Sequence, residues 1–372
     1  MALAGLTRRL KSIRLVKSPE ARSRTGQLFF MGRAFMSRGF TPLECYLYEF
    51  FLKSSATRDY VSRRWIENSF RPALNSRRYL KLLKNKLVFS RFYARKKLPV
   101  LGILGLFHPS FGFSVKGGGL KTGKDLKYLL QKIRTKRIVA KPPCSIGGKG
   151  MMVVEQVASG KLLDIQTEQE ITFERLHERL LTDIATRQPR EDSCTGYLLQ
   201  PYLSPQPSLN PLKGRALNTL RIATLRDIDD NIYLDFGMIR IARPGAVTDN
   251  MHRGGMVASV EVNTGEISPV TYGFENETGP WLEKKPADLG SYFKKRLVPK
   301  WKQMTEMVKE FHSETPGLNS IGWDVTLSKH GPVVIEGNDN WDMIIAQVIE
   351  GGYLTPRRRK ILSQYGVKLP GK

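Results

Sequence analysis

The sequence has little cysteine, few acidic residues and no long apolar segment. Its 372 residues include only three cysteines, Cys45, Cys144 and Cys194, which are far apart and lack the spacing of a zinc finger. We therefore expect three ordinary thiols and a reducing compartment. No apolar run approaches the length that spans a bilayer, and residues 1–24 lack the apolar block of a secretory signal. These absences favour a soluble, cytoplasmic protein without a transmembrane segment.

Several catalytic signatures are also missing. The sequence has no serine nucleophile elbow, no zinc-ligand spacing, no dinucleotide-binding glycine fingerprint and no protein-kinase loop. The usual hydrolase, zinc-enzyme and Rossmann interpretations therefore lose support. At 372 residues, of which 41% are hydrophobic, the chain is long enough for two or three packed subdomains.

Basic residues outnumber acidic ones, and the excess lies near the start of the chain. The net charge is +26, and residues 1–100 hold 23 Lys and Arg against 5 Asp and Glu. A weak apolar stripe runs among these basic residues at Leu3, Leu6, Leu10 and Ile13. Two interpretations stay open for residues 1–100. One is contact with an anionic membrane, nucleic acid or acidic polymer, and the other is a solvated basic surface.

The order of local patterns predicts an α+β fold. At Thr41-Pro42-Leu43-Glu44, a Thr cap, a Pro at the first helical position and a Glu three residues after the cap form a capping box. Strands come largely in adjacent pairs, which predicts antiparallel sheets. We expect helices from Pro42, over Tyr60–Phe70, from Ser76, and over Lys124–Ile133, Phe173–Ile184 and Lys294–Phe311, and strands over Pro99–Leu104, Arg137–Lys141, Met151–Glu155, Tyr197–Gln200, Thr219–Asp227, Ile232–Ala242 and Met256–Val262.

Four segments are expected along the chain. Residues 1–75 form a basic helical N-terminal region, residues 76–199 a first lobe, residues 200–352 a second lobe and residues 353–372 a basic C-terminal tail. The proline-broken loop Pro201–Leu217 lies at the boundary between the two lobes.

The stretch from Ile321 to Asp342 predicts a short hairpin with polar side chains on one face. Two β runs, Ile321–Leu327 and Pro332–Glu336, flank a four-residue turn. A turn of this length sets Asp324 opposite Glu336 or one residue away, and the two-residue period puts Asn338 on the same face. Hard cations such as magnesium prefer oxygen ligands, so these side chains suit a metal nucleotide. A polar hairpin end without a metal is the alternative.

A glycine-rich loop between two β runs is a candidate phosphate site. In Ile138–Glu155, the residues Gly147, Gly148 and Gly150 let the backbone approach a phosphate, while Lys141 and Lys149 supply charge. The loop is not a Walker A motif, because β-type residues follow it instead of a helix. A glycine-rich hairpin turn with a surface lysine is the simpler interpretation.

Two further basic segments are candidates for anion binding. Arg221 follows Asn218-Thr219-Leu220 at the start of a β run, where its guanidinium group can neutralise a transferring phosphoryl group. Arg240 and Arg243 end the next run, and residues of this kind are more often surface or interface cations than catalytic ones. The loop Asn250–Gly255 is suited to closing over an anion, and its His252 has no evident partner.

Taken in order, these pieces resemble the ATP-grasp superfamily. The lysine strand with its GGKG loop, the strand ending in LLQPYL, the Asn-Thr-Leu-Arg strand, the loop closing in GG, and GWDV paired with IEGNDNWD carry the likeness. It covers roughly residues 85–347 and is greatest to the sugar-transfer-associated ATP-grasp group, related to glutamate-ligase-like proteins.

The resemblance implies an ATP-grasp fold in which two α+β lobes enclose ATP. It implies the following roles for residues of this chain: Lys86, Lys141, Gly147, Gly148, Lys149, Gly150 and Asn250 near the nucleotide phosphates, Gln200 to Tyr202 as the adenine hinge, Arg221, Lys141 and Asn338 in catalysis, and Asp324, Glu336 and Asn338 as magnesium ligands. Two positions depart from the family pattern. Asn85 replaces an acidic residue before Lys86, and Gln200 and Pro201 replace an acidic residue before the hinge.

Three functions are compatible with these features. The first is a magnesium- and ATP-dependent ligase that joins a small-molecule or peptide carboxylate, sugar-linked in one version, to an amine through an acyl phosphate. The second is a kinase that phosphorylates a sugar or another hydroxyl acceptor. The third is a non-catalytic basic protein that binds nucleic acid, an anionic membrane or an acidic polymer. The sequence does not set the oligomeric state or identify the substrates.

Overall fold

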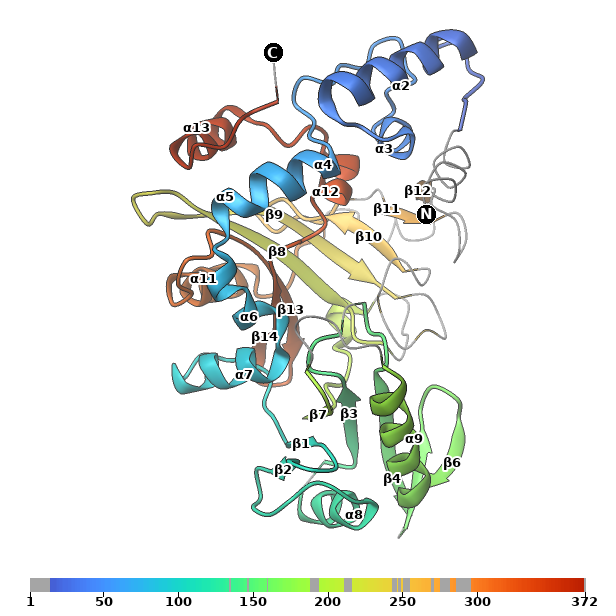
Figure 1. Ribbon diagram of the computed structural model, residues 1–372, viewed down its shortest axis with the longest axis vertical. Helices are drawn as coiled ribbons and strands as arrows, with labels where there is room; N and C mark the ends of the chain where they lie inside the picture. Colours follow the sequence, from blue (N-terminus) through green and yellow to red (C-terminus); the bar gives the residue numbers. More distant parts are fainter. Residues whose placement is uncertain are drawn as a thin grey trace.

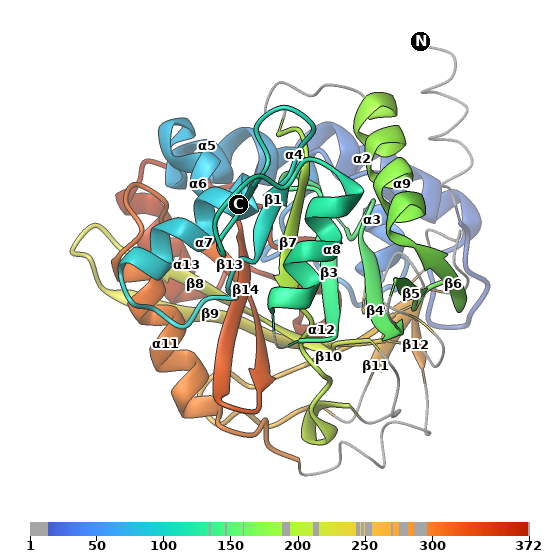
Figure 2. The same ribbon diagram turned by 90° about the horizontal axis from the view of Figure 1, so that it is seen from below.

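Two seven-stranded antiparallel sheets, each with its own helices, form the molecule (Figure 1 and Figure 2). The computed structural model describes residues 14–133, 135–145, 147–158, 160–187, 194–210, 216–242, 246, 249, 255–268, 271–274, 282–285 and 296–370. Every strand ladder among these residues is antiparallel, as the paired β runs predict. The α+β fold class is confirmed.

The first lobe contains a sheet with the strand order β2-β1-β7-β3-β4-β5-β6. Helices α8 (Gly123–Lys132) and α9 (Phe173–Thr186) cover one of its faces and share a core with it. Lys141 pairs with Leu198, so its side chain lies on the opposite face from those helices. The strands are β1 (Gly105–Phe107), β2 (Phe113–Ser114), β3 (Arg137–Lys141), β4 (Met152–Ala158), β5 (Lys161–Asp164), β6 (Gln169–Thr172) and β7 (Tyr197–Pro201).

The second lobe contains the other sheet, with the order β12-β11-β10-β9-β8-β13-β14. Its two faces carry separate apolar clusters. Trp323 belongs to the cluster under α6, α7 and α11, so its neighbour Asp324 lies on the other face. The strands are β8 (Thr219–Arg226), β9 (Ile232–Ile241), β10 (Met256–Ser259), β11 (Thr271–Phe274), β12 (Leu282–Lys285), β13 (Ser320–Ser328) and β14 (Gly331–Asn338), and the helices after the lobe boundary are η3 (Pro207–Leu209), α11 (Trp301–Ser313), α12 (Met343–Glu350) and α13 (Pro356–Gln364).

The N-terminal region is built into the second lobe. The predicted capping box at Thr41 is present, although helix α3 ends after only six residues. Val61, Trp65, Phe70 and Leu74 are buried with Trp341 in the core beneath α12 and α13. The helices of this region are α2 (Arg24–Arg38), α3 (Pro42–Leu47), α4 (Arg63–Trp65), the π-helical η1 (Ile66–Phe70), α5 (Arg71–Leu74), the 3-10 helix η2 (Arg77–Tyr79), α6 (Leu80–Lys84) and α7 (Lys86–Arg95).

Two expected boundaries differ from the structure. Residues 76–98, assigned to the first lobe, pack against β13 and α11 of the second lobe through Leu83, Phe89 and Tyr93. The expected basic tail over residues 353–372 contains α13, because Ile361 and Leu362 are buried while the arginines lie on its other sides. Arg358, for example, donates a 2.7 Å hydrogen bond to Asp235.

Two predicted elements are also wrong. The strand expected over Pro99–Leu104 is absent, because this segment runs beside β14 and makes one parallel bridge there, between Val100 and Val334. The helix expected from Lys294 begins at Trp301, after Pro299 and the bridge between Leu297 and Glu266. Residues 291–295 lie outside the described residues.

The expectation of three free thiols is wrong. Cys144 and Cys194 form a disulfide, with a Cα–Cα distance of 5.7 Å, and Cys45 is free and buried. The fold explains this pairing, because Cys144 follows β3 and Cys194 precedes its antiparallel neighbour β7.

Within the described part of the chain, no helix combines the length and apolar character that crossing a bilayer requires.

Candidate functional site

The hairpin of β13 and β14 places the three predicted metal ligands on one face. Asp324 lies opposite Glu336, and Gly322 lies opposite Asn338, as the two-residue period predicts. A bulge follows Asp324, so the residues beyond it pair in a shifted register. At Gly322 a Cβ atom would come within 2.1 Å of the Trp341 Cβ and 2.9 Å of the Arg221 Cδ. Only glycine at position 322 therefore leaves room for the side chains of Trp341 and Arg221.

Asp324 is buried between two arginines. Arg221 Nε donates a 2.5 Å hydrogen bond to one carboxylate oxygen, and Arg240 Nη2 donates a 2.6 Å bond to the other. Burial alone would raise the pKa of Asp324, but the two guanidinium groups outweigh burial and lower that pKa to about 2. Asp324 is therefore a carboxylate at every pH near neutrality.

Arg240 was underestimated from the sequence, where it ranked as a surface cation. It also donates to Thr219 Oγ1 and lies 3.6 Å from Asp249. Burial lowers the pKa of Arg240, but Asp324 and Asp249 raise it by more, so that the pKa lies above its ordinary value. Thr219 donates its backbone N–H to Asp249 at 3.0 Å. Arg240 lies opposite Thr219, two residues from Arg221, and the residue types alone do not indicate this register.

The predicted Asn250 lies outside the described residues, as do Arg243 and His252. Its neighbour Asp249 is described and occupies the arginine cluster. Whether Asn250 contacts a nucleotide stays a prediction.

Lys86 reaches the hairpin from the start of α7. Asn85 caps this helix by accepting hydrogen bonds from the backbone of Leu87 and Val88. Lys86 Nζ then lies 3.3 Å from Glu336 Oε2 and donates a 2.6 Å hydrogen bond to the carbonyl of Ser145 in the glycine-rich loop. Lys86 therefore bridges the β13–β14 hairpin of the second lobe and the glycine-rich loop of the first.

Lys141 faces the same carboxylates from the end of β3. Burial is the main cause that lowers the pKa of Lys141 to about 8; Lys86 also lowers this pKa, while Glu336 and Asp324 raise it. Lys141 belongs to the first lobe, and charged groups packed in the second lobe thus affect its pKa. Asp249 lies 3.6 Å from Arg240 and Asp342 lies 3.4 Å from Arg221, so four carboxylates meet the two lysines and two arginines and the formal charges balance. The amines and guanidinium groups are nevertheless donors suited to phosphate oxygens.

The glycine-rich loop has the backbone that only glycine adopts easily. Gly147, Gly148 and Gly150 have φ of 65°, 70° and 72°. A Cβ at Gly150 would also come within 3.0 Å of Pro142 and 3.3 Å of the Tyr197 hydroxyl. Lys149 is exposed. The structure confirms a tight glycine turn at this position, and phosphate binding by it stays a prediction.

The predicted hinge lies along the same strand pair. Gln200 pairs with Val139, and Tyr202 N–H donates to the Arg137 carbonyl at the opposite end of β3 from Lys141. The Gln200 amide nitrogen donates to the Leu101 and Gly102 carbonyls, while its buried side-chain oxygen has no hydrogen-bond partner in the part of the chain that the structure describes. The predicted hinge and Lys141 thus lie on one strand pair, and contact of the hinge with adenine stays a prediction.

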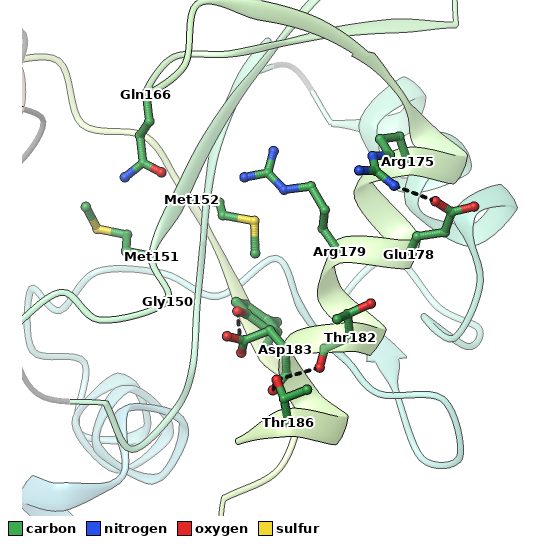
Figure 3. Close-up of a pocket in the computed structure, with 11 residues that line it drawn as sticks. Gly150, Met151, Met152, Gln166, Arg175, Glu178, Arg179, Thr182, Asp183 and Thr186 are labelled. Atoms are coloured by element: carbon green, nitrogen blue, oxygen red, sulfur yellow. Dashed lines mark hydrogen bonds and ion pairs between the residues drawn. The ribbon is translucent and has the colours of Figure 1, made fainter. Parts of the chain in front are cut away.

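A hollow of about 630 Å³ opens beside the end of the glycine loop (Figure 3). It lies between α9 and the strand that begins at Met152. Met152 and Tyr197 face α9, whereas Lys141 faces away from that helix. The hollow is therefore on the far side of the first sheet from the charged cluster. Within it, Tyr197 donates a 2.7 Å hydrogen bond to Asp183 and supports the base of the loop.

The hairpin residues fit a hard divalent cation. Among the described residues, no group of three His, Cys, Asp or Glu side chains has metal-binding geometry, so the ligand set would depend on the amide of Asn338. Among the described residues, the buried Asn338 amide nitrogen has no hydrogen-bond partner. Rotating the amide by 180° exchanges its oxygen and nitrogen, and that rotation would break no hydrogen bond donated by this nitrogen. Carboxylate and amide oxygens are the donors that magnesium prefers.

The chain matches one family model and is similar in part to several solved structures. The family model described as "Sugar-transfer associated ATP-grasp" matches residues 66–363, whereas no curated protein matches the chain. A biotin carboxylase complex from Campylobacter jejuni is 13% identical with a TM-score of 0.47, over 80% of this chain and 50% of that one. N5-carboxyaminoimidazole synthetase from Staphylococcus aureus with ADP is 11% identical with a TM-score of 0.41, over 78% and 54%.

A third solved structure has the same kind of likeness. L-amino acid ligase from Bacillus licheniformis is 12% identical with a TM-score of 0.37, over 72% of this chain and 45% of that one. The chain spans about half the length of these three structures.

Proposed function

Because this chain belongs to the sugar-transfer associated ATP-grasp family, we propose that it is an ATP-dependent ligase that joins a carboxylate to an amine. The observation that carries this proposal is the meeting of Lys86 and Lys141 with Glu336, at the junction of the two lobes. A site of this kind places cations from both lobes around a carboxylate that suits a metal nucleotide.

In the proposed reaction, a carboxylate oxygen of the substrate attacks the γ-phosphorus of ATP and ADP leaves. The resulting acyl phosphate is then attacked at its carbonyl carbon by the amine, which loses a proton as inorganic phosphate departs. ATP, acid and amine thus give ADP, phosphate and an amide. The described cluster supplies positioning and positive charge rather than a general base.

Each residue has a distinct part in this scheme. Glu336, Asn338 and Asp324 would hold magnesium, which when bound neutralises charge on the β- and γ-phosphates. Lys141 and Lys86 contact phosphate oxygens from the two lobes. Arg221, fixed by Asp324, stabilises the transferring phosphoryl group.

Substrates linked to sugars are part of the proposal. The family description associates this group with sugar transfer, which favours an acid or amine attached to a sugar, as in polysaccharide or sugar-conjugate biosynthesis.

The test is an ADP-release screen in which sugar acids, acidic amino acids and peptides are paired with amine acceptors. For the active pair, we expect Lys141→Ala and Glu336→Ala each to lower the rate at least about 100-fold. Lys161→Ala and Glu170→Ala are matched controls, because this exposed pair, 2.7 Å apart, lies on the outer strands of the first lobe. We expect the controls to stay within about twofold of wild type.

Asp324 is unsuitable for this comparison, because its removal leaves two buried arginines without their shared carboxylate and destabilises the fold. The mass of the product separates the possible reactions. Free phosphate and a condensed product support the ligase, whereas phosphate attached to the acceptor identifies a kinase. Full activity in both site variants, or no ADP release and no thermal stabilisation by magnesium ATP, contradicts the proposal.

A further inference from the structure

Helix α2 exposes large apolar side chains to solvent. Leu28, Phe29 and Met36 are 46%, 76% and 83% exposed. The opposite side of the helix is buried through Gln27, Met31 and Ala34. The helix is therefore anchored to the protein by one face. Burial in the core does not account for the apolar side chains on its exposed face.

The three exposed apolar side chains share one face of the helix. Leu28, Phe29 and Met36 are spaced one and eight residues apart, which places them within about 100° of one another around the helix axis. The exposed Arg24 and Arg33 project on either side of this face at the same period. An apolar stripe flanked by cations on one helix face is the pattern of a segment that lies in the surface of an anionic bilayer.

The helix is also held firmly. Ser23 caps its start by accepting a hydrogen bond from Gly26. Gln27 donates to the carbonyls of Val16 and Arg22, both at 2.8 Å, and accepts from the Val16 N–H at 3.0 Å. Gly39 ends the helix in the left-handed conformation. The apolar side chains are thus presented on a rigid support.

We infer that the face formed by Leu28, Phe29 and Met36 with Arg24 and Arg33 binds an anionic lipid membrane. Charge complementarity favours this partner, since residues 1–100 hold 23 basic and 5 acidic residues. Nucleic acid or an acidic polymer would use the charge but not the apolar side chains. The inference is independent of the ligase proposal, because α2 contributes no residue to the charged cluster.

The position of α2 is compatible with membrane docking. In Figure 1, α2 and α3 lie at the end of the molecule opposite α8 and β2 of the first lobe. A membrane against α2 therefore leaves the first lobe on the aqueous side. The stripe at Leu3, Leu6, Leu10 and Ile13 lies outside the described residues and has no part in the inference.

The test is flotation of the full chain with lipid vesicles. Vesicles of phosphatidylcholine with about 30% phosphatidylserine are compared with phosphatidylcholine alone, at about 0.1 M salt. We expect binding to the anionic vesicles only. The triple variant Leu28→Ser, Phe29→Ser, Met36→Ser should lower that binding at least about tenfold. The double variant Arg24→Gln, Arg33→Gln should bind anionic vesicles more weakly than wild type.

A matched variant controls for the general loss of exposed apolar surface. Val115, Tyr128 and Ile228 are 53%, 53% and 57% exposed and lie away from α2, so replacing all three by Ser should leave vesicle binding unchanged. Thermal unfolding and circular dichroism establish that each variant is folded.

Three results would overturn the inference. The first is no binding of the wild-type chain to anionic vesicles. The second is equal binding by wild type and the folded triple variant, which assigns the contact to charge elsewhere. The third is a dimer in sedimentation that the triple variant dissociates, with no vesicle binding, because the face would then belong to a second copy of the chain.

Discussion

The charge of Lys141 depends strongly on its surroundings. It lies at the end of β3, where burial lowers its pKa to about 8. Phosphate oxygens bind the protonated amine, which predominates below that pH and is lost as the pH rises through it. Nucleotide affinity should therefore be constant between about pH 6 and 7.5 and decrease by up to about tenfold per pH unit above 8.

Calorimetric titration with ADP from pH 6 to 9.5 measures this dependence. Lys141→Arg is the control, because arginine keeps its charge across the whole range. The arginine variant should show a flatter profile above pH 8, whatever its absolute affinity. An equally steep decrease in the variant would mean that another group is responsible.

At the residue scale, site residues were predicted well from the sequence where suitable side chains occur within one short hairpin. Asp324 and Glu336 follow from a hairpin with a short turn, and the structure places them opposite each other. Arg240 was undervalued because its partners depend on the register of β8 and β9. A bulge between Ala223 and Thr224 shifts that register, and residue types alone do not indicate a bulge.

At the element scale, the start of β13 is held by one side chain from the N-terminal region. Asn75, buried at 2% exposure, donates to the Ser320 carbonyl at 2.8 Å. Its side-chain oxygen accepts from the N–H groups of Asn319 and Ser320 at 2.9 and 3.1 Å. Asn75 therefore satisfies backbone groups of Asn319 and Ser320 at the point where β13 begins.

Replacing Asn75 by Ala should lower the free energy of unfolding by about 2–4 kcal/mol, since three buried hydrogen bonds are lost together. Denaturant titration followed by tryptophan fluorescence measures the change. Asn263→Ala is the matched control, because Asn263 bonds to Glu261 in an exposed turn and should alter stability by less than about 1 kcal/mol. Equal effects of the two substitutions would contradict this role for Asn75.

Elements with their own local signals were predicted well, and elements set by tertiary contacts were not. The capping box at Thr41 and strand β3 appear where the sequence predicts them. Pro99–Leu104 has strand-like composition, yet its backbone bonds to β14, where Val334 N–H donates to the Pro99 carbonyl at 3.1 Å. Such pairing depends on a strand more than 200 residues away in the sequence.

At the scale of the whole molecule, the first 75 residues complete the second lobe. Val61, Trp65, Ile66, Phe70 and Leu74 are buried in the same cluster as Trp341 and α13. The sequence suggested helices here but not their partners, because an apolar stripe does not identify what it packs against. The N-terminal region thus forms part of the core of the second lobe, and any binding role of its basic residues is additional to this structural role.

A fragment over residues 76–372 should therefore fail to fold. Each lost side chain contributes about 1.5–3 kcal/mol, so the five together rival the whole stability of a typical domain, about 5–15 kcal/mol. We expect an insoluble or non-cooperatively unfolding fragment, and partial recovery when residues 1–75 are supplied as a separate chain. A soluble fragment with a cooperative thermal transition would show that the N-terminal region is dispensable.

The disulfide between Cys144 and Cys194 makes part of the first lobe a covalent ring. β4, β5, β6 and α9 lie within it, and β3 and β7 lie just outside as neighbouring strands. A protease that cuts the chain once inside the ring leaves both new ends attached through sulfur. While the disulfide is oxidised, a nicked first lobe keeps its two central strands tethered, so a single cleavage there does not separate the protein into two pieces.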